Sequence, residues 1–335
     1  MTGPILERST GEIPGSDARS EQRAWVRDRL LAWFRANARD LPWRRTRDPY
    51  RVLVSEVMLQ QTQVDRVIPY YEAFLAAFPT VGALAAAPTA EVIRFWSGLG
   101  YNRRAVNLQR AAQAVVERHG GVFPAEVNDL IALPGIGPYT AGAVACFAFE
   151  RDVAFIDTNM RRVLHRLFIG PEKEPTTATE RATLAIAAAM VPPGDGWAWN
   201  QGLIEFGALQ CTARRPACVV CPLRERCDSA PTIQSSLATP RAQSRGAVPF
   251  EQTNRYARGR VVEALRGLGN DPAVVGVRLS DLGAMVRPEF TGADLPWIRG
   301  VIEGLQRDGL ARVVREEGSD YNVGSVDDDP LVRLP

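Results

Sequence analysis

Four cysteines in one short segment are the most specific chemical signal in this sequence. Cys211, Cys218, Cys221 and Cys227 have six, two and five residues between successive sulfurs. Thiolates gathered at this spacing are metal ligands, so the alternatives are Zn²⁺ and an iron–sulfur cluster. Four-cysteine zinc sites usually use two Cys-x-x-Cys pairs, whereas this segment has one. The spacing favours a [4Fe–4S] cluster, and the fifth cysteine, Cys146, lies in an apolar run typical of a buried core thiol.

Two carboxylates lie beside apolar segments. Glu56 has apolar residues on both sides, which indicates either a stripe on the surface or a buried group. Burial would raise its pKa and keep it protonated as a general acid. Asp157 follows the apolar run Val153 to Ile156 and precedes a helical pattern. Taken alone, Asp157 is therefore best explained as a helix N-cap.

A glycine-rich turn precedes one of the predicted helices. Gly135 and Gly137 are followed by Tyr139, Thr140 and an Ala/Gly-rich stretch. This pattern predicts a helix, a tight hairpin and a second helix. The open amide groups of that second helix could bind a phosphate without regard to base sequence. A purely structural tight turn is the alternative.

The elements that must position these residues are helical. From Glu21 to about Gly207, apolar residues recur at spacings of three and four, turns are marked by Gly and Pro, and alternating strand patterns are scarce. We therefore expect an all-α domain over residues 21–228, after a polar leader at 1–20, with the cysteine loop at 211–227.

The remaining C-terminal part has a different organisation. Residues 229–250 are rich in Ser, Thr, Pro, Gln and Ala and predict a linker. Residues 251–335 predict a winged-helix-like module with helices at 256–265, 279–285 and 298–310. Its expected hairpin would use strands at 311–314 and 320–323. A small helical appendage without a ligand is the alternative.

Composition excludes several classes of protein. The chain has 335 residues, 46% hydrophobic and 23% charged, with no run of about 20 apolar residues that could span a membrane. The polar start predicts no secretory signal, so we expect a cytoplasmic, nucleoid-associated protein. The net charge of +2 does not by itself indicate a nucleic-acid partner, although the basic surplus surrounds the cysteines.

Taken together, these motifs resemble a known family. Glu56 with Gln60 to Thr62, the hairpin, Asp157 and the cysteine loop occur in the order typical of the endonuclease III superfamily of helix-hairpin-helix DNA glycosylases. Within it, they are most similar to the MutY adenine glycosylases. The resemblance covers about Arg29 to Cys227. Its most specific segments are 41–44, 55–64 and 98–101.

The resemblance implies an activity and a catalytic site. A base-excision-repair enzyme of this family flips adenine, mispaired with 8-oxoguanine or guanine, out of double-stranded DNA and hydrolyses its N-glycosidic bond. By analogy Glu56 would protonate N7 of adenine, and Asp157, supported by Asn159, would stabilise the oxocarbenium-like sugar or bond to it transiently. Tyr139 would lie beside the glycosidic bond.

The resemblance also implies binding residues and a cofactor. The cofactor is a [4Fe–4S] cluster on the four loop cysteines, and we expect a monomer. The residues implied in substrate and DNA binding are Trp43, Arg44 and Glu205 around adenine, Gln60, Gln61, Thr62 and Tyr101 at the opposite base, and Gly135, Gly137 and Thr140 at the hairpin.

The lysine content predicts whether the enzyme also cuts the DNA backbone. Glycosylases with that second activity commonly form a Schiff base through a lysine, which the endonuclease III branch places in the hairpin. This chain has Tyr139 there, and its single lysine is Lys173. We therefore expect a monofunctional glycosylase.

Some features depart from the family pattern. Thr158 stands where glycine is common, Asn102 where a second tyrosine is common, and residues 251–335 lack the NUDIX-like signature. Lesion recognition would then fall to the catalytic domain, with non-specific phosphate contacts from the tail module. The alternatives are a thymine or uracil glycosylase at G mismatches and, from another class, a non-catalytic DNA-binding protein. Glu56 and the Gln-Gln-Thr segment favour adenine.

Overall fold

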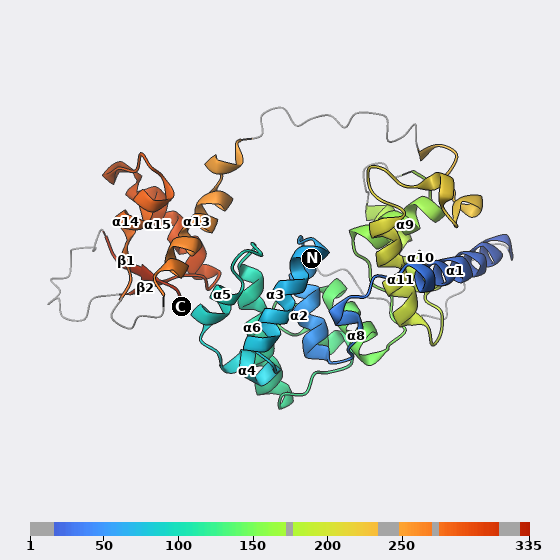
Figure 1. Ribbon diagram of the computed structural model, residues 1–335, viewed down its shortest axis with the longest axis horizontal. Coiled ribbons are helices and arrows are strands. Elements are labelled where there is room, and N and C mark those ends of the chain that lie inside the picture. The colour runs from blue at the N-terminus through green and yellow to red at the C-terminus, as the bar shows by residue number, and fades with distance from the viewer. Residues whose placement is uncertain (1–16, 172–176, 234–247, 270–274, 315–328) are drawn as a thin grey trace. The chain divides into compact units, whose positions relative to one another are not determined.

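Helices dominate the computed structural model, which describes residues 17–171, 177–233, 248–269, 275–314 and 329–335 (Figure 1). This confirms the predicted helical class. The chain divides into two compact units. The first unit comprises residues 1–56, 123–132 and 136–243, and the second comprises 57–122, 133–135 and 244–335.

The first unit contains the helices around the two candidate carboxylates. They are α1 (Asp17–Asn37), most of α2 (Pro49–Leu59), α7 (Val127–Ile131), α8 (Pro138–Phe149), α9 (Thr158–Phe168), α10 (Thr177–Met190) and α11 (Gly196–Leu209). Helix α8 is buried from Thr140 to Ala148. Its small residues allow close packing, because a Cβ atom on Gly142 would lie 2.7 Å from Cβ of Phe155. Packing thus explains the Ala/Gly-rich composition of this segment.

Short 3-10 turns carry other candidate residues of the first unit. The turn η1 (Pro42–Arg44) holds Trp43 and Arg44, and two more turns, η2 (Cys218–Val220) and η3 (Arg224–Arg226), lie within the cysteine loop. Ser229 and Ile233, expected in a linker, are instead buried at 1% and 2% exposure. The linker prediction is therefore wrong for these residues, and positions 234–247 lie outside the described part of the chain.

The second unit joins four central helices to the C-terminal module. The central helices are α3 (Val64–Ala77), α4 (Val81–Ala86), α5 (Thr89–Phe95) and α6 (Arg103–His119). The module contains α13 (Asn254–Gly267), α14 (Leu279–Val286), α15 (Leu295–Arg307) and the short turns η4 (Phe250–Gln252) and η5 (Gly292–Asp294). The three predicted module helices are confirmed.

The strands of the module differ from the prediction. The sheet has the order β1-β3-β2, with β1 (Val277–Arg278), β2 (Arg312–Val314) and β3 (Leu331–Arg333). Both outer strands are antiparallel to β3, and Val332 is paired with Val277 on one side and Val313 on the other. The expected partner of β2 at 320–323 lies outside the described residues, and within the described part of the chain β2 is paired with β3.

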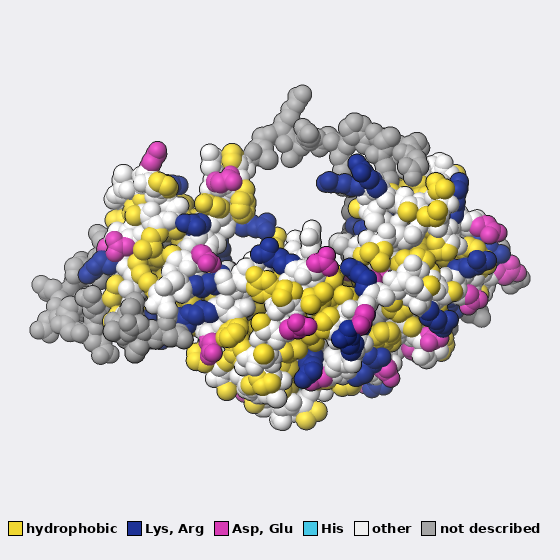
Figure 2. Space-filling model, in the orientation of Figure 1, with side chains coloured by type: hydrophobic (Ala, Val, Ile, Leu, Met, Phe, Trp, Pro, Cys, Tyr) yellow, Lys and Arg dark blue, Asp and Glu magenta, His cyan; other side chains and the backbone are white. Residues whose placement is uncertain are grey.

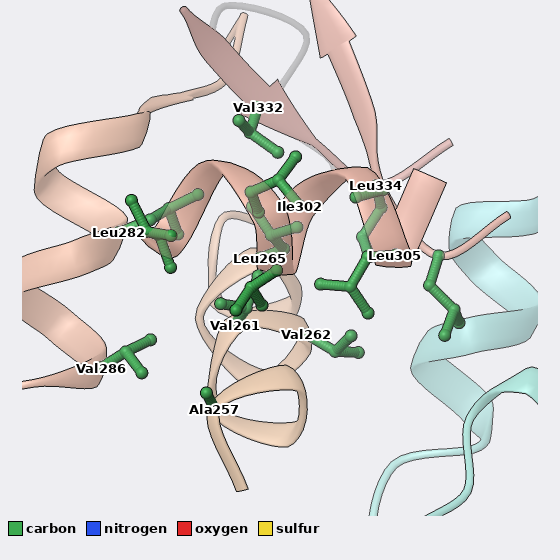
Figure 3. Packing of buried hydrophobic residues seen from close by; sticks show 14 of the residues in the cluster. Ala257, Val261, Val262, Leu265, Leu282, Val286, Ile302, Leu305, Val332 and Leu334 are labelled. Atoms are coloured by element: carbon green, nitrogen blue, oxygen red, sulfur yellow. The ribbon is translucent and has the colours of Figure 1, made fainter. Parts of the chain in front are cut away.

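One apolar core connects the module to the central helices of its unit. The α13 residues Val261, Val262 and Leu265 are buried together with residues of α14, α15 and β3 (Figure 3). The same cluster includes Ile93 of α5 and Val106 of α6. The module therefore shares its core with the helices beside it.

On the face drawn in Figure 2, basic, acidic and apolar side chains are interspersed. Among the described residues, no helix is both long and apolar enough to cross a membrane.

Candidate active site

Glu56 is a buried acid on α2. Only 5% of the residue is exposed to solvent. Burial raises the pKa of Glu56 to about 7, and the negative charge of Asp157 adds to the rise, while a hydrogen bond from Tyr139 and the charge of Arg44 oppose it. Of the two interpretations of this residue, a buried group fits the structure and a surface stripe does not. Near neutral pH such a group can hold a proton and donate it.

Asp157 is the N-cap of α9 and also a neighbour of Glu56. Its Oδ1 accepts a hydrogen bond from the Met160 backbone N at 2.6 Å, and its Oδ2 accepts one from Asn159 Nδ2 at 3.0 Å. Burial raises the pKa of Asp157, and these hydrogen bonds counteract part of that rise. The cap and the site near Glu56 are compatible, since the cap uses one carboxylate oxygen and holds the other in place.

Tyr139 lies near the start of α8 and connects the hairpin to the acids. Burial raises its pKa well above the ordinary value, and the charges of Glu56 and Asp157 raise it further. Its ring packs edge-on against Phe155 at 5.5 Å between centroids. A hydroxyl that stays protonated can donate to the Glu56 carboxyl group, so Tyr139 helps to orient that acid.

The two hairpin glycines meet different structural requirements. Gly135 has φ of +75°, and a Cβ atom on it would lie 2.6 Å from Cβ of Asn107. Gly137 is the N-cap of α8, followed by Pro138 at the first helical position. Thr140 is 3% exposed, so its side chain lies inside the protein. A phosphate contact at this hairpin would therefore use backbone amides and not the Thr140 hydroxyl.

Glu205 is the centre of a buried ion-pair cluster. It is 0% exposed on α11, and Arg39 donates to it from Nε at 2.8 Å, from Nη2 at 2.8 Å and from its backbone N at 3.0 Å. Arg44 Nη2 donates to Glu205 Oε2 at 2.9 Å, and Arg44 Nε donates to Gln201 at 2.8 Å. Burial raises the pKa of Glu205, but the hydrogen bonds from Arg39 and Arg44 outweigh it and lower the pKa to about 2.

This cluster fixes the short turn that carries Trp43. Trp43 is 6% exposed, and the guanidinium of Arg44 is shared between Glu205, Gln201 and the Arg39 carbonyl. Sequence reasoning singled out Trp43, Arg44 and Glu205 but missed Arg39. Arg39 lies five residues before Arg44, which is close enough for both arginines to contact the same carboxylate. This spacing is the sequence pattern that could have identified Arg39.

Arg162 connects Asp157 to the cysteine loop and was also missed. Its Nη2 donates to Asn159 Oδ1 at 2.8 Å and to the Gly207 carbonyl at 2.6 Å, and its Nε donates to the Cys211 carbonyl at 2.8 Å. Gly207 leaves room for this arrangement, because a Cβ there would lie 2.8 Å from Cβ of Asn159. An arginine five residues after an N-cap has no distinguishing sequence pattern.

The four loop cysteines surround one cavity. Its lining includes all four, together with Arg166, Leu167 and Phe206. Arg166 Nη1 donates to Cys211 Sγ at 3.5 Å and to the Thr212 carbonyl at 2.8 Å. Across the described part of the chain, no three Cys, His, Asp or Glu side chains are grouped to hold a single metal ion. Four thiols around a cavity with a buried cation beside them are a donor set that suits an anionic cluster.

A separate group of candidate residues lies in the second unit. The Tyr101 hydroxyl donates to Gln61 Oε1 at 3.3 Å. Both residues have left-handed backbone conformations, with φ of +47° for Tyr101 and +62° for Gln61. Such values are costly for residues with a Cβ atom and often mark functional sites. The structure thus brings together the 60–62 and 98–101 segments.

Arg104 holds these two segments in place. Its Nη1 donates to the Val57 carbonyl at 2.8 Å and its Nη2 to Thr62 Oγ1 and the Leu99 carbonyl, each at 3.2 Å. Burial lowers the pKa of Arg104 to about 10. This residue, too, was missed from the sequence, where it is one of many arginines.

Comparison with known proteins agrees with this geometry. Residues 54–188 match the family model of the HhH-GPD superfamily of base excision DNA repair proteins. Over 240 residues the chain is 42% identical to the adenine DNA glycosylase of Mycolicibacterium smegmatis, an alignment that covers 71% of this chain and 79% of that relative. The chain belongs to the adenine DNA glycosylase family.

Other members of the adenine DNA glycosylase family match at similar identity. The Mycobacterium tuberculosis enzyme is 38% identical over 238 residues, with 71% of this chain and 77% of the relative covered. The human enzyme is 42% identical over 211 residues, which are 60% of this chain and 38% of the relative.

Solved structures support the same fold. A thermostable thymine-DNA glycosylase matches with a TM-score of 0.60 and 32% identity, covering 64% of this chain and 99% of that one. A trapped covalent complex of endonuclease III with DNA matches with a TM-score of 0.54 and 24% identity, covering 63% and 96%. The second likeness shows the helix-hairpin-helix glycosylase fold alone.

The metal type left open by the sequence is also decided. Residues 211–227 match the iron–sulfur binding domain of endonuclease III, a range that begins and ends at loop cysteines. The cofactor of this adenine DNA glycosylase family member is therefore an iron–sulfur cluster of the [4Fe–4S] type, and zinc is excluded as the alternative.

Proposed function

We propose that this protein removes adenine mispaired with 8-oxoguanine or guanine from double-stranded DNA and leaves an abasic site. The observation that carries the proposal is the pairing of Glu56, which has a pKa of about 7, with Asp157 close enough to raise it. Two neighbouring carboxyl groups with different environments suit an acid and a charge stabiliser, the arrangement used in glycosidic bond cleavage.

Glu56 supplies the proton. In the protonated state it donates to N7 of the flipped adenine, which makes the base a better leaving group. The C1′–N9 bond then breaks and its electron pair goes to the base. The Tyr139 hydrogen bond orients the acid, and the low exposure of Glu56 keeps its proton from exchanging freely with water.

Asp157 stabilises the positive charge that remains on the sugar. Its oxygens are held by the Met160 amide and by Asn159, so the carboxylate is fixed before the reaction begins. Water then attacks C1′, and its proton passes to the Glu56 carboxylate, which restores the acid. This sequence requires no lysine nucleophile, and the hairpin has Tyr139 at that position. Lys173 lies outside the described residues.

The binding residues divide into groups. Trp43, Arg44 and Glu205 form a rigid cluster that we assign to the adenine pocket. The second group, Gln60, Gln61, Thr62 and Tyr101, we assign to the gap left by the flipped base and to the opposite base. The amides of Gly135, Gly137 and the following turn would bind a DNA phosphate.

The cysteine loop would carry the cluster through Cys211, Cys218, Cys221 and Cys227. The bound cluster would tie four points of the loop together and so hold its fold. Arg166, 3% exposed, places positive charge next to Cys211 and keeps the loop backbone attached to α9. The loop and Asp157 are thus anchored on the same helix.

A single-turnover assay tests the function. Duplexes with A opposite 8-oxoguanine, A opposite G, T opposite G and U opposite G would be incubated with excess enzyme and then treated with alkali to cut abasic sites. We expect adenine loss, fastest opposite 8-oxoguanine, with no strand cleavage before alkali. Loss of thymine or uracil would favour the second candidate, which the likeness to a thymine-DNA glycosylase structure supports.

A further inference from the structure

The C-terminal module touches the loop that carries Tyr101. The guanidinium carbon of Arg255, on α13, lies 4.3 Å from the centroid of the Tyr101 ring. Arg255 also lies 5.8 Å from the ring centroid of Phe250, which belongs to the module as well. Tyr101 is 43% exposed, and Arg104 lies 5.6 Å from the same ring centroid, so Arg255 is the nearer of the two cations on this ring.

A second contact of α13 reaches the next residue of the same loop. Arg266 Nη2 donates to Asn102 Oδ1 at 2.8 Å and to the Ile93 carbonyl at 3.0 Å. Arg255 and Arg266 are eleven residues apart, which is close to three helical turns, so they lie on one face of α13. One helix face therefore contacts both Tyr101 and Asn102.

The helix that makes these contacts is firmly seated. Val261, Val262 and Leu265 of α13 share a buried core with Ile93 and Val106 of the central helices. A hydrogen bond also links α13 to α5, since Arg94 of α5 donates to the Gly269 carbonyl just after α13. Such a core allows little sliding of α13 against the loop, so the position of Arg255 is set by packing and not by the loop itself.

We propose that Arg255 is a positioning residue for Tyr101 and that the C-terminal module thereby sets the preference of the enzyme for the base opposite adenine. The inference rests on the proposed function, in which Tyr101 contacts that base. Tyr101 has φ of +47°, a conformation that the surrounding structure must maintain. Stacking of a cation on its exposed ring favours one orientation of the side chain before DNA binds.

A fixed ring matters most for discrimination. Guanine and 8-oxoguanine differ by few atoms, so telling them apart depends on contacts placed at defined positions. A ring that must first be ordered loses part of the energy of those contacts. Removal of Arg255 should therefore reduce the preference for one opposite base more than it reduces DNA binding in general.

The test compares three full-length variants in the single-turnover assay. Arg255→Ala removes the stacked cation, Arg255→Lys restores a cation at the same position, and Arg260→Ala is the control. Arg260 is exposed on the same helix, so its removal changes the net charge equally. The quantity measured is the ratio of excision rates for adenine opposite 8-oxoguanine and opposite guanine.

We expect Arg255→Ala to lower this ratio about fivefold, Arg255→Lys to restore most of it and Arg260→Ala to leave it within about twofold of wild type. In a Tyr101→Ala background, Arg255→Ala should have no further effect on the ratio, because the pair acts as a unit. Thermal unfolding and visible absorbance of each variant verify that the fold and the cluster are intact.

Two results would overturn the inference. One is an unchanged ratio in Arg255→Ala. The other is an equal loss of binding to every duplex together with a shallower salt dependence, which would make Arg255 a phosphate contact. Failure of the proposed function is distinguishable, because wild-type protein would then release no adenine from any duplex.

Discussion

Arg162 and Asn159 are joined by a hydrogen bond of 2.8 Å between the arginine Nη2 and the asparagine Oδ1. Asn159 in turn donates to Asp157 Oδ2, while Arg162 also donates to the Cys211 carbonyl. A continuous set of hydrogen bonds thus runs from the candidate charge stabiliser to the first cysteine of the cluster loop. Each link in this set is a direct hydrogen bond, and both Asn159 and Arg162 lie on helix α9.

Replacing Arg162 with Met should weaken catalysis and stability together. The variant removes the hydrogen bonds of Arg162 to Asn159 Oδ1 and to the Gly207 and Cys211 carbonyls, and leaving a buried acceptor unpaired costs about 1–3 kcal/mol. We expect excision to slow by about 10- to 100-fold, as for other residues that orient an active group. Single-turnover rates and thermal unfolding measure the two effects. Arg118→Met, at an exposed arginine of α6, is the matched control.

The visible absorbance of the cluster provides a further measurement for Arg162→Met. If the hydrogen bond from Arg162 to the Cys211 carbonyl holds the cysteine loop in place, the variant should contain less iron per protein. Wild-type excision rates in Arg162→Met would contradict the view that Arg162 supports Asp157 through Asn159.

Excision should depend on pH through Glu56. Its pKa is about 7 in the folded protein against 4.5 for an ordinary glutamate, so the acid is mostly protonated below pH 7. The rate should therefore fall above about pH 7, approaching about tenfold per pH unit. The raised pKa also means that Glu56 contributes stability that is fully present below pH 4.5 and is lost as pH rises through 7.

Glu56→Gln tests both parts of this expectation. It should abolish measurable excision, while stability above pH 7 should increase because no buried charge forms. The exposed Glu117→Gln on α6 is the control and should change neither. A Glu56→Gln enzyme that excises at the wild-type rate would exclude Glu56 as the acid.

Asp157→Asn should separate catalysis from helix capping. Asparagine is as good an N-cap as aspartate, so the Met160 amide keeps an acceptor, but the Asn159 amide loses the second oxygen, and the free energy of unfolding should fall by about 1 kcal/mol. The negative charge is lost, however, and excision should slow by on the order of 10² to 10³-fold. Asp157→Ala should lose both the negative charge and the acceptor that caps the helix, with a further cost of about 1 kcal/mol in the free energy of unfolding.

The chemical groups of the site could be predicted from the sequence because each had a local pattern. The cysteine spacing, the apolar flanks of Glu56 and the position of Asp157 before a helix are all readable in short windows. The contacts of Arg39, Arg104 and Arg162 could not be predicted, because each joins segments far apart in the sequence. Arg104, for example, holds residue 57 and residue 62 from more than forty positions away.

In the C-terminal module, too, elements with a local pattern could be predicted from the sequence and tertiary contacts could not. Helices α13, α14 and α15 were predicted from apolar spacing and β2 from its place after the third helix, but β3 (Leu331–Arg333) was not predicted. Its pairing with β1 and β2 depends on tertiary contacts. The shared core with Ile93 and Val106 likewise depends on packing between distant helices.

The buried Glu205 cluster should be needed for folding at neutral pH. Glu205→Gln would leave Arg39 and Arg44 without a counter-charge, and breaking such a buried pair costs about 3–5 kcal/mol. We expect a lower unfolding midpoint and, at temperatures where the variant stays folded, weaker excision because the Trp43–Arg44 turn loses its anchor. Calorimetry and the single-turnover assay give the two values, with Glu117→Gln as control.

The pH dependence of this stability has a defined sign. The pKa of Glu205 is lowered to about 2 from an ordinary 4.5, so its contribution is fully present above pH 4.5 and is lost as pH falls through 2. Between those values wild type should lose stability faster than Glu205→Gln as the solution is acidified. Parallel curves for the two proteins across this range would mean that Arg39 and Arg44 do not stabilise the ionised form of Glu205.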